Sequence, residues 1–286
     1  MASPLSLDDV DNALLRTYVL GCHIMNHHHV VDAYGHLSVR LSPSVFLMCR
    51  YMAPALVARR DDLVLYYVDT GEAVHPETAP RGFSERYIHS EVYKAYPGVQ
   101  AVIHSHSLDV VPFSLVSSSS YSSSSSTATP LRACIHIAGF LGTAVPVWDA
   151  TAAYYDAHPD VDRSMLVNNT AMGASLAQAL GRGKSEAEGL PLNSVALMRG
   201  HGYVCTGESI EMVVAKAIYT AQNARVQMDA MRLSAASGVS GLSGDILFFD
   251  EREAGDTGRT TIQGAAKPWP LWMAEVTADP LYRIEL

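Results

Sequence analysis

The sequence is poor in cysteine, in positive charge and in long apolar runs. Its 286 residues include only four cysteines, with no CxxC pair or disulfide-like spacing, so we expect a reduced, cytoplasmic protein. The net charge of −9 argues against a nucleic-acid-binding surface. No apolar run is long enough to span a membrane, and the N-terminus lacks the basic and apolar regions of a signal peptide. Nucleic-acid-binding and membrane proteins are therefore not among the expected classes.

The sequence does contain enough apolar residues for a substantial core, at 48%. Strand-like and helical segments are mixed throughout, which indicates a single three-layer α/β domain over residues 1–286. Within it, residues 117–127 are almost all serine and are expected to form a flexible surface insertion, and residues 236–286 form a C-terminal extension. We expect helices over residues 7–30, 84–96, 107–116, 165–180 and 210–233. We expect strands over residues 36–41, 44–49, 63–68, 101–107, 131–136, 143–147 and 194–198. Residues 234–264 are expected to be irregular, and residues 268–286 to pack back on the body.

The most informative segment is residues 101–107, an apolar strand that ends in His104 and His106. Residues i and i+2 of an extended strand point to the same side, so the two imidazoles can converge on one point. Imidazole is a common ligand of zinc and other transition metals. A third histidine, His201, lies between two glycines that allow close backbone approach. Three histidines leave coordination positions open, as in catalytic rather than structural zinc sites.

Glu85 stands near the expected start of the helix that precedes this strand. Because a helix that returns to the next strand can bring its first turn near the strand's end, Glu85 can be a metal ligand, a general base or both. A carboxylate beside a Lewis-acidic metal can abstract a proton next to a carbonyl. The alternative is that Glu85 only interacts favourably with the helix dipole, and spacing alone favours that alternative.

Three segments together resemble the class II aldolase/adducin family: Ser84-Glu85 at a helix start, the His-x-His pair at a strand end, and His201-Gly202 after an apolar strand. Residues 35–40 and 217–225 extend the match, which spans roughly 8–235 in the right order. The resemblance implies a central, mainly antiparallel sheet flanked by helices. It implies that His104, His106 and His201 bind Zn²⁺, or another divalent metal such as Fe²⁺ or Mn²⁺, and that Glu85 is the catalytic acid/base. It also implies a homotetramer with active sites at subunit interfaces.

Two positions depart from the sugar-phosphate aldolases of that family, which carry Gly-Asn in the first loop and paired serines before the glutamate. This chain has Gly35-His36 and Phe83-Ser84 instead. Imidazole and phenyl groups replace small hydrogen-bonding groups that a phosphate needs, so we expect a non-phosphorylated substrate. His36 is then a second candidate catalytic residue, as a carboxylate or carbonyl partner or as a proton-transfer group. The loop also resembles a family branch that includes a pyridine-dicarboxylate decarboxylase.

Several further residues have two interpretations. The candidate substrate-binding residues are Gly35, Arg40, Phe83, Ser84 and His89. A guanidinium suits a carboxylate, but Arg40 and Arg199 can equally form loop-fixing ion pairs. His89 lies one turn after Glu85 on the same helix face, and can orient it, line the cleft or simply pack in the interior. The cluster 27–29 of three histidines is expected at a surface or helix end, and His136 in a structural role.

The sequence therefore predicts a divalent-metal-dependent lyase that cleaves or forms a carbon–carbon bond next to a carbonyl of a small molecule, as an aldolase or a decarboxylase. In both reactions, a metal-bound carbonyl or phenolate must accept the electrons of the broken bond. Two alternatives remain open: a non-haem iron oxygenase on the same scaffold, and a non-catalytic, adducin-like assembly module. The presence of all three histidines and the glutamate favours an enzyme.

Overall fold

The computed structural model describes residues 5–116, 130–181, 189–239, 245–264 and 266–286, so the serine-rich residues 117–127 lie outside the described part. One seven-stranded sheet forms its centre. The strands are β1 (His36–Arg40), β2 (Val45–Cys49), β3 (Leu63–Tyr67), β4 (Ala101–Ser105), β5 (Val147–Trp148), β6 (Val195–Met198) and β7 (Gly202–Gly207). Their order is β3-β2-β1-β4-β7-β6-β5, and every neighbouring pair is antiparallel except β5 and β6. The expected mainly antiparallel sheet is confirmed.

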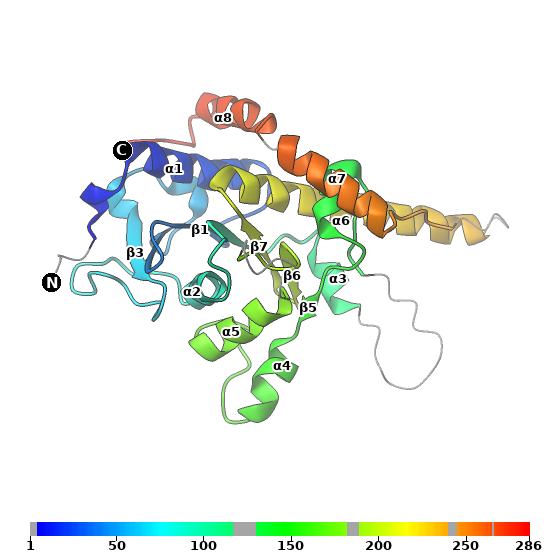
Figure 1. Cartoon of the computed structure of the whole chain (residues 1–286), viewed down its shortest axis with the longest axis horizontal. Helices are drawn as coiled ribbons and strands as arrows, with labels where there is room; N and C mark the ends of the chain where they lie inside the picture. The colour runs from blue at the N-terminus through cyan, green and yellow to red at the C-terminus, as the bar shows by residue number, and fades with distance from the viewer. Residues whose placement is uncertain (1–4, 117–129, 182–188, 240–244, 265) are drawn as a thin grey trace.

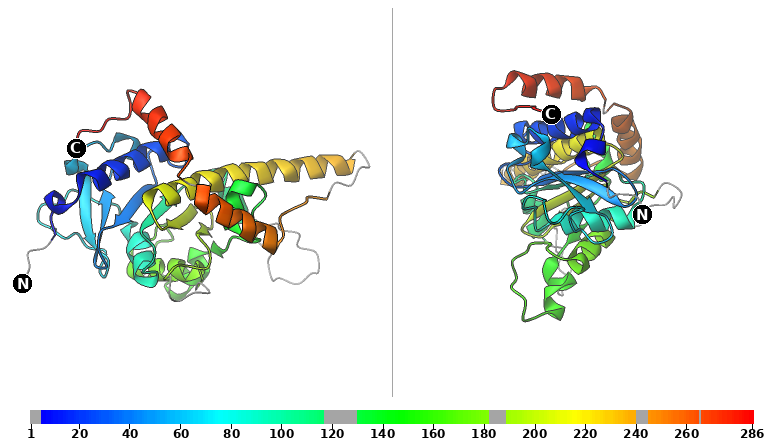
Figure 2. Two further views of the ribbon diagram at one scale, coloured as in Figure 1. Left: turned by 45° about the horizontal axis from the view of Figure 1, so that its top comes forward. Right: turned by 90° about the vertical axis from the view of Figure 1, so that its left-hand side faces the viewer.

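Helices cover both faces of this sheet. The helices α1 (Asn12–His27) and α6 (Ile210–Val239) lie on one face, and α2 (Arg86–Ala95) and α5 (Thr170–Ala179) lie on the other (Figure 1). The layers are also visible in the end-on view of Figure 2. Every residue of β4 and β7 is buried, as expected of strands covered on both sides. The three-layer arrangement is confirmed.

Helix α1 shows how the sequence specifies an element and its place. The Asp11 carboxylate accepts a hydrogen bond from the N–H of Ala13 and so caps the first turn. Apolar side chains then recur at helical spacing and are buried against the sheet. One of them, Tyr18, donates its hydroxyl to the carbonyl of Leu37 and accepts from the N–H of Cys49. A single phenol therefore ties α1 to both β1 and β2.

Four expected helix starts are displaced. Helix α1 begins at Asn12 and not at residue 7. Helix α2 begins at Arg86 with Glu85 as its N-cap residue, one position later than a cap at Ser84 requires. Helix α5 begins at Thr170, after Asn169, whose side chain accepts from the N–H of Met172. Residues 165–169 stay outside this helix because Met165 has φ of 64° and the N-cap residue Asn169 is extended, with φ of −149° and ψ of 164°. The helix expected over 107–116 is the shorter α3 (Val111–Leu115).

Residues 131–136 do not form the expected strand, and the strand expected over 143–147 is reduced to β5. The side chains of α6 take over the role of a strand partner. Asn223 accepts from the N–H groups of Cys134 and Ile135, and Gln227 accepts from that of Arg132. The chain then enters the 3₁₀ helix η4 (His136–Leu141). Because these partners come from a distant helix, the local apolar pattern does not reveal them.

The prediction that residues 234–264 are irregular is wrong in two places. Helix α6 continues to Val239, and α7 (Glu251–Gly264) is a helix that packs against η4. Its glycines disfavour a helix by propensity. Gly258 nevertheless lies so close to Gly139 that a Cβ atom on Gly139 would be only 2.4 Å from the nitrogen of Gly258. The contact between the two helices compensates for the weak local preference.

The C-terminal residues pack back on the body, as expected. Helix α8 (Pro268–Ala278) lies along α1, with Trp272 and Val276 buried (Figure 1). None of the helices in the described ranges combines the length and the apolar character needed to cross a membrane.

Candidate metal centre

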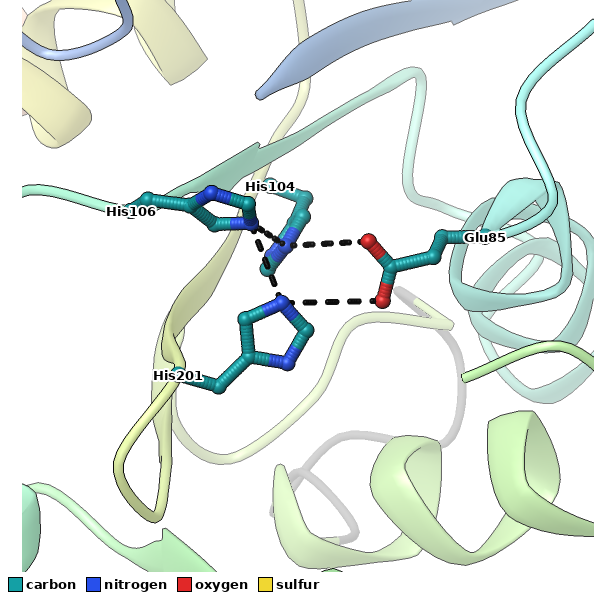
Figure 3. A group of neighbouring side chains, drawn as sticks. All are labelled: Glu85, His104, His106 and His201. Atoms are coloured by element: carbon teal, nitrogen blue, oxygen red, sulfur yellow. Dashed lines mark hydrogen bonds and ion pairs between the residues drawn. The ribbon is translucent and has the colours of Figure 1, made fainter. Parts of the chain in front are cut away.

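Four side chains from three separate parts of the chain meet at one point (Figure 3). His104 lies near the end of β4 and His106 just beyond it, as the two-residue spacing predicts. His201 lies in the tight turn between β6 and β7, where Gly200 has φ of 67°. Glu85 reaches the same point from the N-terminus of α2. The structure thus brings together all four residues that the sequence predicts for the centre.

The ring nitrogens of the three histidines converge. Nε2 of His106 lies 2.8 Å from Nε2 of His104 and 3.0 Å from Nε2 of His201. The two oxygens of Glu85 lie 3.7 Å from Nε2 of His104 and 3.7 Å from Nε2 of His201. All four ligand atoms fall within 4.8 Å of one another. Nitrogen and carboxylate donors in this number are typical of a tetrahedral or five-coordinate catalytic zinc site.

The chemistry of the donors fits a divalent cation. Nδ1 of His104 faces the carbonyl oxygen of Tyr203 at 3.1 Å, so it carries the ring proton. Nε2 of His104 then carries no proton, and its lone pair points at the other histidines. Hydrogen bonds alone cannot satisfy three imidazole nitrogens that meet at one point, because each neutral ring has a single N–H. A cation at that point accepts all three lone pairs.

The protonation states also suit metal binding. Burial lowers the pKa of His104 well below its usual value and that of His201 to about 4, so both rings are neutral near pH 7. Burial also lowers the pKa of His106. Burial raises the pKa of Glu85 to about 7. A hydrogen bond from the N–H of Val167 favours the ionised form and partly offsets this effect of burial. A carboxyl group with that pKa can both release and return a proton at neutral pH.

Close backbone approach explains two glycines at the centre. A side chain on Gly202 would collide with the carbonyl of Ser105, so the turn that carries His201 can close onto β4 only with glycine there. Gly35 has φ of 88°, and a Cβ atom on it would lie 3.0 Å from the carbonyl oxygen of His104. Gly35 thus allows the loop before β1 to pass close to the backbone of His104, and its role as a substrate-binding residue stays a prediction.

His36 and Phe83 lie beside the metal-binding group. His36 pairs with His104 across β1 and β4, and the centroids of their rings are 5.2 Å apart. The Phe83 ring is 4.6 Å from that of His36 and nearly buried. His89 is fully buried and its Nε2 lies 2.7 Å from Nδ1 of His36. Ser84 is exposed, next to Glu85.

Arg40 is not brought to the centre. It lies at the opposite end of β1 from His36, and its guanidinium donates to the backbone carbonyls of Val99, Tyr93 and Tyr96. Arg199 forms an ion pair with Asp149, with 2.7 Å between Nε and Oδ2. Of the two interpretations of these arginines, the structure therefore favours the structural one. His27 and His28 end α1 beside Glu275, and His136 is exposed at the start of η4.

Sequence reasoning missed the residues behind the centre. The backbone N–H of Val167 donates to Oε1 of Glu85, and the segment before it is fixed by a hydrogen bond from the N–H of Met165 to the hydroxyl of Tyr155. Ser38 and Tyr93 extend the contact between His36 and His89 into the interior. In the sequence, the only sign of the contacts of Ser38 and Tyr93 is that each places a hydroxyl group among apolar residues.

Comparison with known proteins agrees with this geometry. Residues 18–228 match the model of the Class II Aldolase and Adducin N-terminal domain. The chain belongs to the class II aldolase/adducin family. It is 41% identical over 272 residues to decarboxylase tropJ of Talaromyces stipitatus, covering 94% of this chain and 96% of that protein. It is also 26% identical over 208 residues to 3,4-dihydroxyphthalate decarboxylase of Arthrobacter keyseri, covering 70% of this chain and 71% of that protein.

Solved structures of the family share the fold at low sequence identity. L-fuculose 1-phosphate aldolase of Glaciozyma antarctica has a TM-score of 0.64 at 20% identity, over 99% of this chain and 96% of that one. An aldolase II superfamily protein of Pseudomonas syringae has a TM-score of 0.67 at 16% identity, over 96% and 97%. The family membership, the decarboxylase relatives and the group of four donors together support a lyase that depends on a divalent metal.

Proposed function

We propose that this protein is a decarboxylase of a non-phosphorylated, hydroxyl-bearing carboxylic acid, with His104, His106 and His201 as the ligands of Zn²⁺. The observation that carries the proposal is the convergence of three neutral imidazole nitrogens beside a buried carboxyl group. Glu85 acts as the acid/base and completes the coordination when no substrate is bound. Among the reactions open to the family, the relatives' names favour decarboxylation over aldol cleavage.

The proposed reaction needs an electron acceptor and a proton donor. The carbon–carbon bond to the carboxylate breaks, CO₂ leaves, and the electron pair passes into an adjacent carbonyl or phenol system. A bound divalent cation supplies the Lewis acid that stabilises the negative charge there. Glu85, whose carboxyl oxygens lie 3.7 Å from Nε2 of His104 and of His201, is placed to donate a proton to the carbon that lost CO₂. The net change replaces a carboxyl group by hydrogen.

The side chains around the centre support an aromatic or otherwise planar substrate. Phe83 and Tyr51 form an edge-on pair 5.4 Å apart, and Phe83 also contacts the His36 ring. Ser84 is exposed, and no second serine precedes it to complete a phosphate site. Apolar ring faces favour an aromatic acid over a sugar phosphate because they offer few hydrogen bonds to phosphate oxygens.

The test measures metal content and CO₂ release in parallel. The purified protein is loaded with Zn²⁺, Fe²⁺ or Mn²⁺ and offered 3,4-dihydroxyphthalate, related hydroxybenzoates and L-fuculose 1-phosphate. We expect one metal per chain and CO₂ release from a hydroxylated aromatic acid, with loss of both in His104→Ala and His201→Ala. His28→Ala is the control, because that histidine lies at the end of α1 beside Glu275. Cleavage of the sugar phosphate without CO₂ release would refute the proposal.

Two other functions are outcomes of the same experiment. Activity that requires both Fe²⁺ and O₂, lost under anaerobic conditions, would identify a non-haem iron oxygenase. A purified protein that takes up no metal would favour an adducin-like assembly module.

We also propose a homotetramer, as the family resemblance implies, and a cytoplasmic location, as the few scattered cysteines favour. Analytical ultracentrifugation at several protein concentrations tests the assembly. A monomer at all concentrations would contradict the tetramer. Activity per chain that stays constant on dilution to the monomer would contradict active sites at subunit interfaces. Fluorescence microscopy of the tagged chain tests the location.

A further inference from the structure

A line of four hydrogen-bonded side chains leads from the metal centre into the interior. Nδ1 of His36 lies 2.7 Å from Nε2 of His89, and Nδ1 of His89 lies 2.6 Å from the hydroxyl of Ser38. The Ser38 hydroxyl lies 2.7 Å from that of Tyr93. All four residues are at most 2% exposed. His36 and Ser38 come from β1, and His89 and Tyr93 come from α2.

Only one order of donors and acceptors along this line gives every proton a hydrogen-bond acceptor. Among the described residues, Ser38 Oγ is the acceptor within reach of the Tyr93 hydroxyl, so Tyr93 donates to Ser38. Ser38 then has its own proton to give, and it gives it to Nδ1 of His89. His89 must therefore carry its proton on Nε2 and donate it to Nδ1 of His36. The reverse direction leaves a buried phenol proton unpaired, which is costly.

Both imidazoles in the line are neutral. Burial lowers the pKa of His89 to about 3. His36 accepts the proton of His89 at Nδ1, and a doubly protonated ring has no nitrogen that can accept. A neutral ring that accepts at Nδ1 has its single proton on Nε2. No hydrogen-bond partner of His36 Nε2 occurs among the described side chains and backbone. The His36 ring stands next to that of His104, at the edge of the metal centre.

We propose that Tyr93, Ser38 and His89 are positioning residues that hold His36 as the Nε2–H tautomer, and that this N–H donates a hydrogen bond to a carboxylate oxygen of the substrate. The second half rests on the function proposed above, whereas the first half concerns the protein alone. A fixed neutral donor orients a carboxylate without adding charge beside a cation. The same arrangement discriminates against a substrate that presents an N–H at this point, because two donors would then meet.

The tautomer is tested directly by ¹⁵N spectroscopy of the histidine rings in the zinc-loaded protein. The His36→Asn variant identifies the His36 signals by their disappearance. We expect the wild type to show the proton on Nε2, and Tyr93→Phe and Ser38→Ala to move the His36 ring toward a mixture of tautomers. Tyr66→Phe is the matched control, because Tyr66 is also buried and packs against Phe46 as Tyr93 does, but lies outside the line. An unchanged His36 spectrum in Tyr93→Phe and Ser38→Ala overturns the proposal.

The substrate half is tested by calorimetry with 3,4-dihydroxyphthalate and by steady-state kinetics. Losing one fixed hydrogen bond should weaken binding about five- to tenfold in Tyr93→Phe, with KM raised more than kcat is lowered and the zinc content unchanged. His89→Gln keeps one acceptor and one donor and should restore most of the affinity that His89→Leu loses. Equal affinities in wild type and Tyr93→Phe, together with a changed tautomer, would overturn the substrate half. A wild type that binds the acid but releases no CO₂ would refute only the decarboxylase function.

Discussion

Replacing Glu85 by glutamine should change stability in opposite directions with and without metal. Burial raises the pKa of Glu85 from 4.5 to about 7 in the folded protein, which corresponds to about 3 kcal/mol. The folded state thus binds this proton more tightly than the unfolded state does. The metal-free wild type therefore loses about 3 kcal/mol as the pH rises from 4.5 through 7. The variant has no such carboxyl group, and its amide oxygen can still accept from Val167.

The assay is urea unfolding of both proteins after chelation, at pH 5, 6, 7 and 8. Other groups also titrate in this range, for example His23, whose pKa burial lowers to about 4. The difference between wild type and variant isolates Glu85, because the other groups are common to both. We expect that difference to grow in favour of Glu85→Gln, toward about 3 kcal/mol at pH 8.

Added Zn²⁺ should reverse the order. A cation beside Glu85 lowers the pKa of the carboxyl group, so the charge that destabilises the metal-free protein becomes a favourable ligand. The wild type should gain more stability from Zn²⁺ than Glu85→Gln does at pH 8. Parallel stability curves in the absence of metal would refute the burial argument, and an equal gain from Zn²⁺ would refute the ligand role.

Three further changes test the surroundings of the centre. His104→Ala should reduce the affinity for Zn²⁺ at least 100-fold, measured by competition with a chromophoric chelator, since even the loss of an outer partner costs 10–100-fold. Gly35→Ala should lower the free energy of unfolding by about 1–3 kcal/mol in urea, because φ is 88° and the new Cβ lies 2.6 Å from Val31 Cγ1. Arg40→Met should lower Tm through the loss of its carbonyl contacts and leave KM unchanged, whereas KM would rise if Arg40 bound substrate beside the metal.

Much of the fold could be predicted because its signals are local. The apolar spacing of α1 and the buried run of β4 specify their own secondary structure. The convergence of His104 and His106 follows from the two-residue period of a strand. By contrast, the backbone of residues 131–136 is paired by Asn223 and Gln227 of α6, and α7 is held by its contact with Gly139. Those determinants are tertiary, so the local pattern does not contain them.

The candidate site likewise contains residues that the sequence identifies and residues that only the fold identifies. Histidine spacing and the flanking glycines identify the residues of the metal centre, because metal ligands are chemically distinctive. Ser38 and Tyr93 are ordinary strand and helix residues in the sequence, and their role depends on the pairing of β1 with β4 and on the packing of α2 across them. Arg40 illustrates the converse: its charge suggests an anion site, but the structure directs it to backbone carbonyls and over the Tyr93 ring.

The register between β1 and β4 shows how one scaffold can serve different substrates. His36 and His104 are directly paired across the two strands, so the residue proposed to contact the substrate and a residue proposed to bind the metal stand side by side on separate strands. A change at position 36 therefore alters the group offered to the substrate and leaves the three metal-binding histidines in place. The replacement must also offer a hydrogen-bond partner to the buried His89, whose other nitrogen is engaged by Ser38. Substrate preference in this fold thus depends on the interior behind the loop as well as on the loop itself.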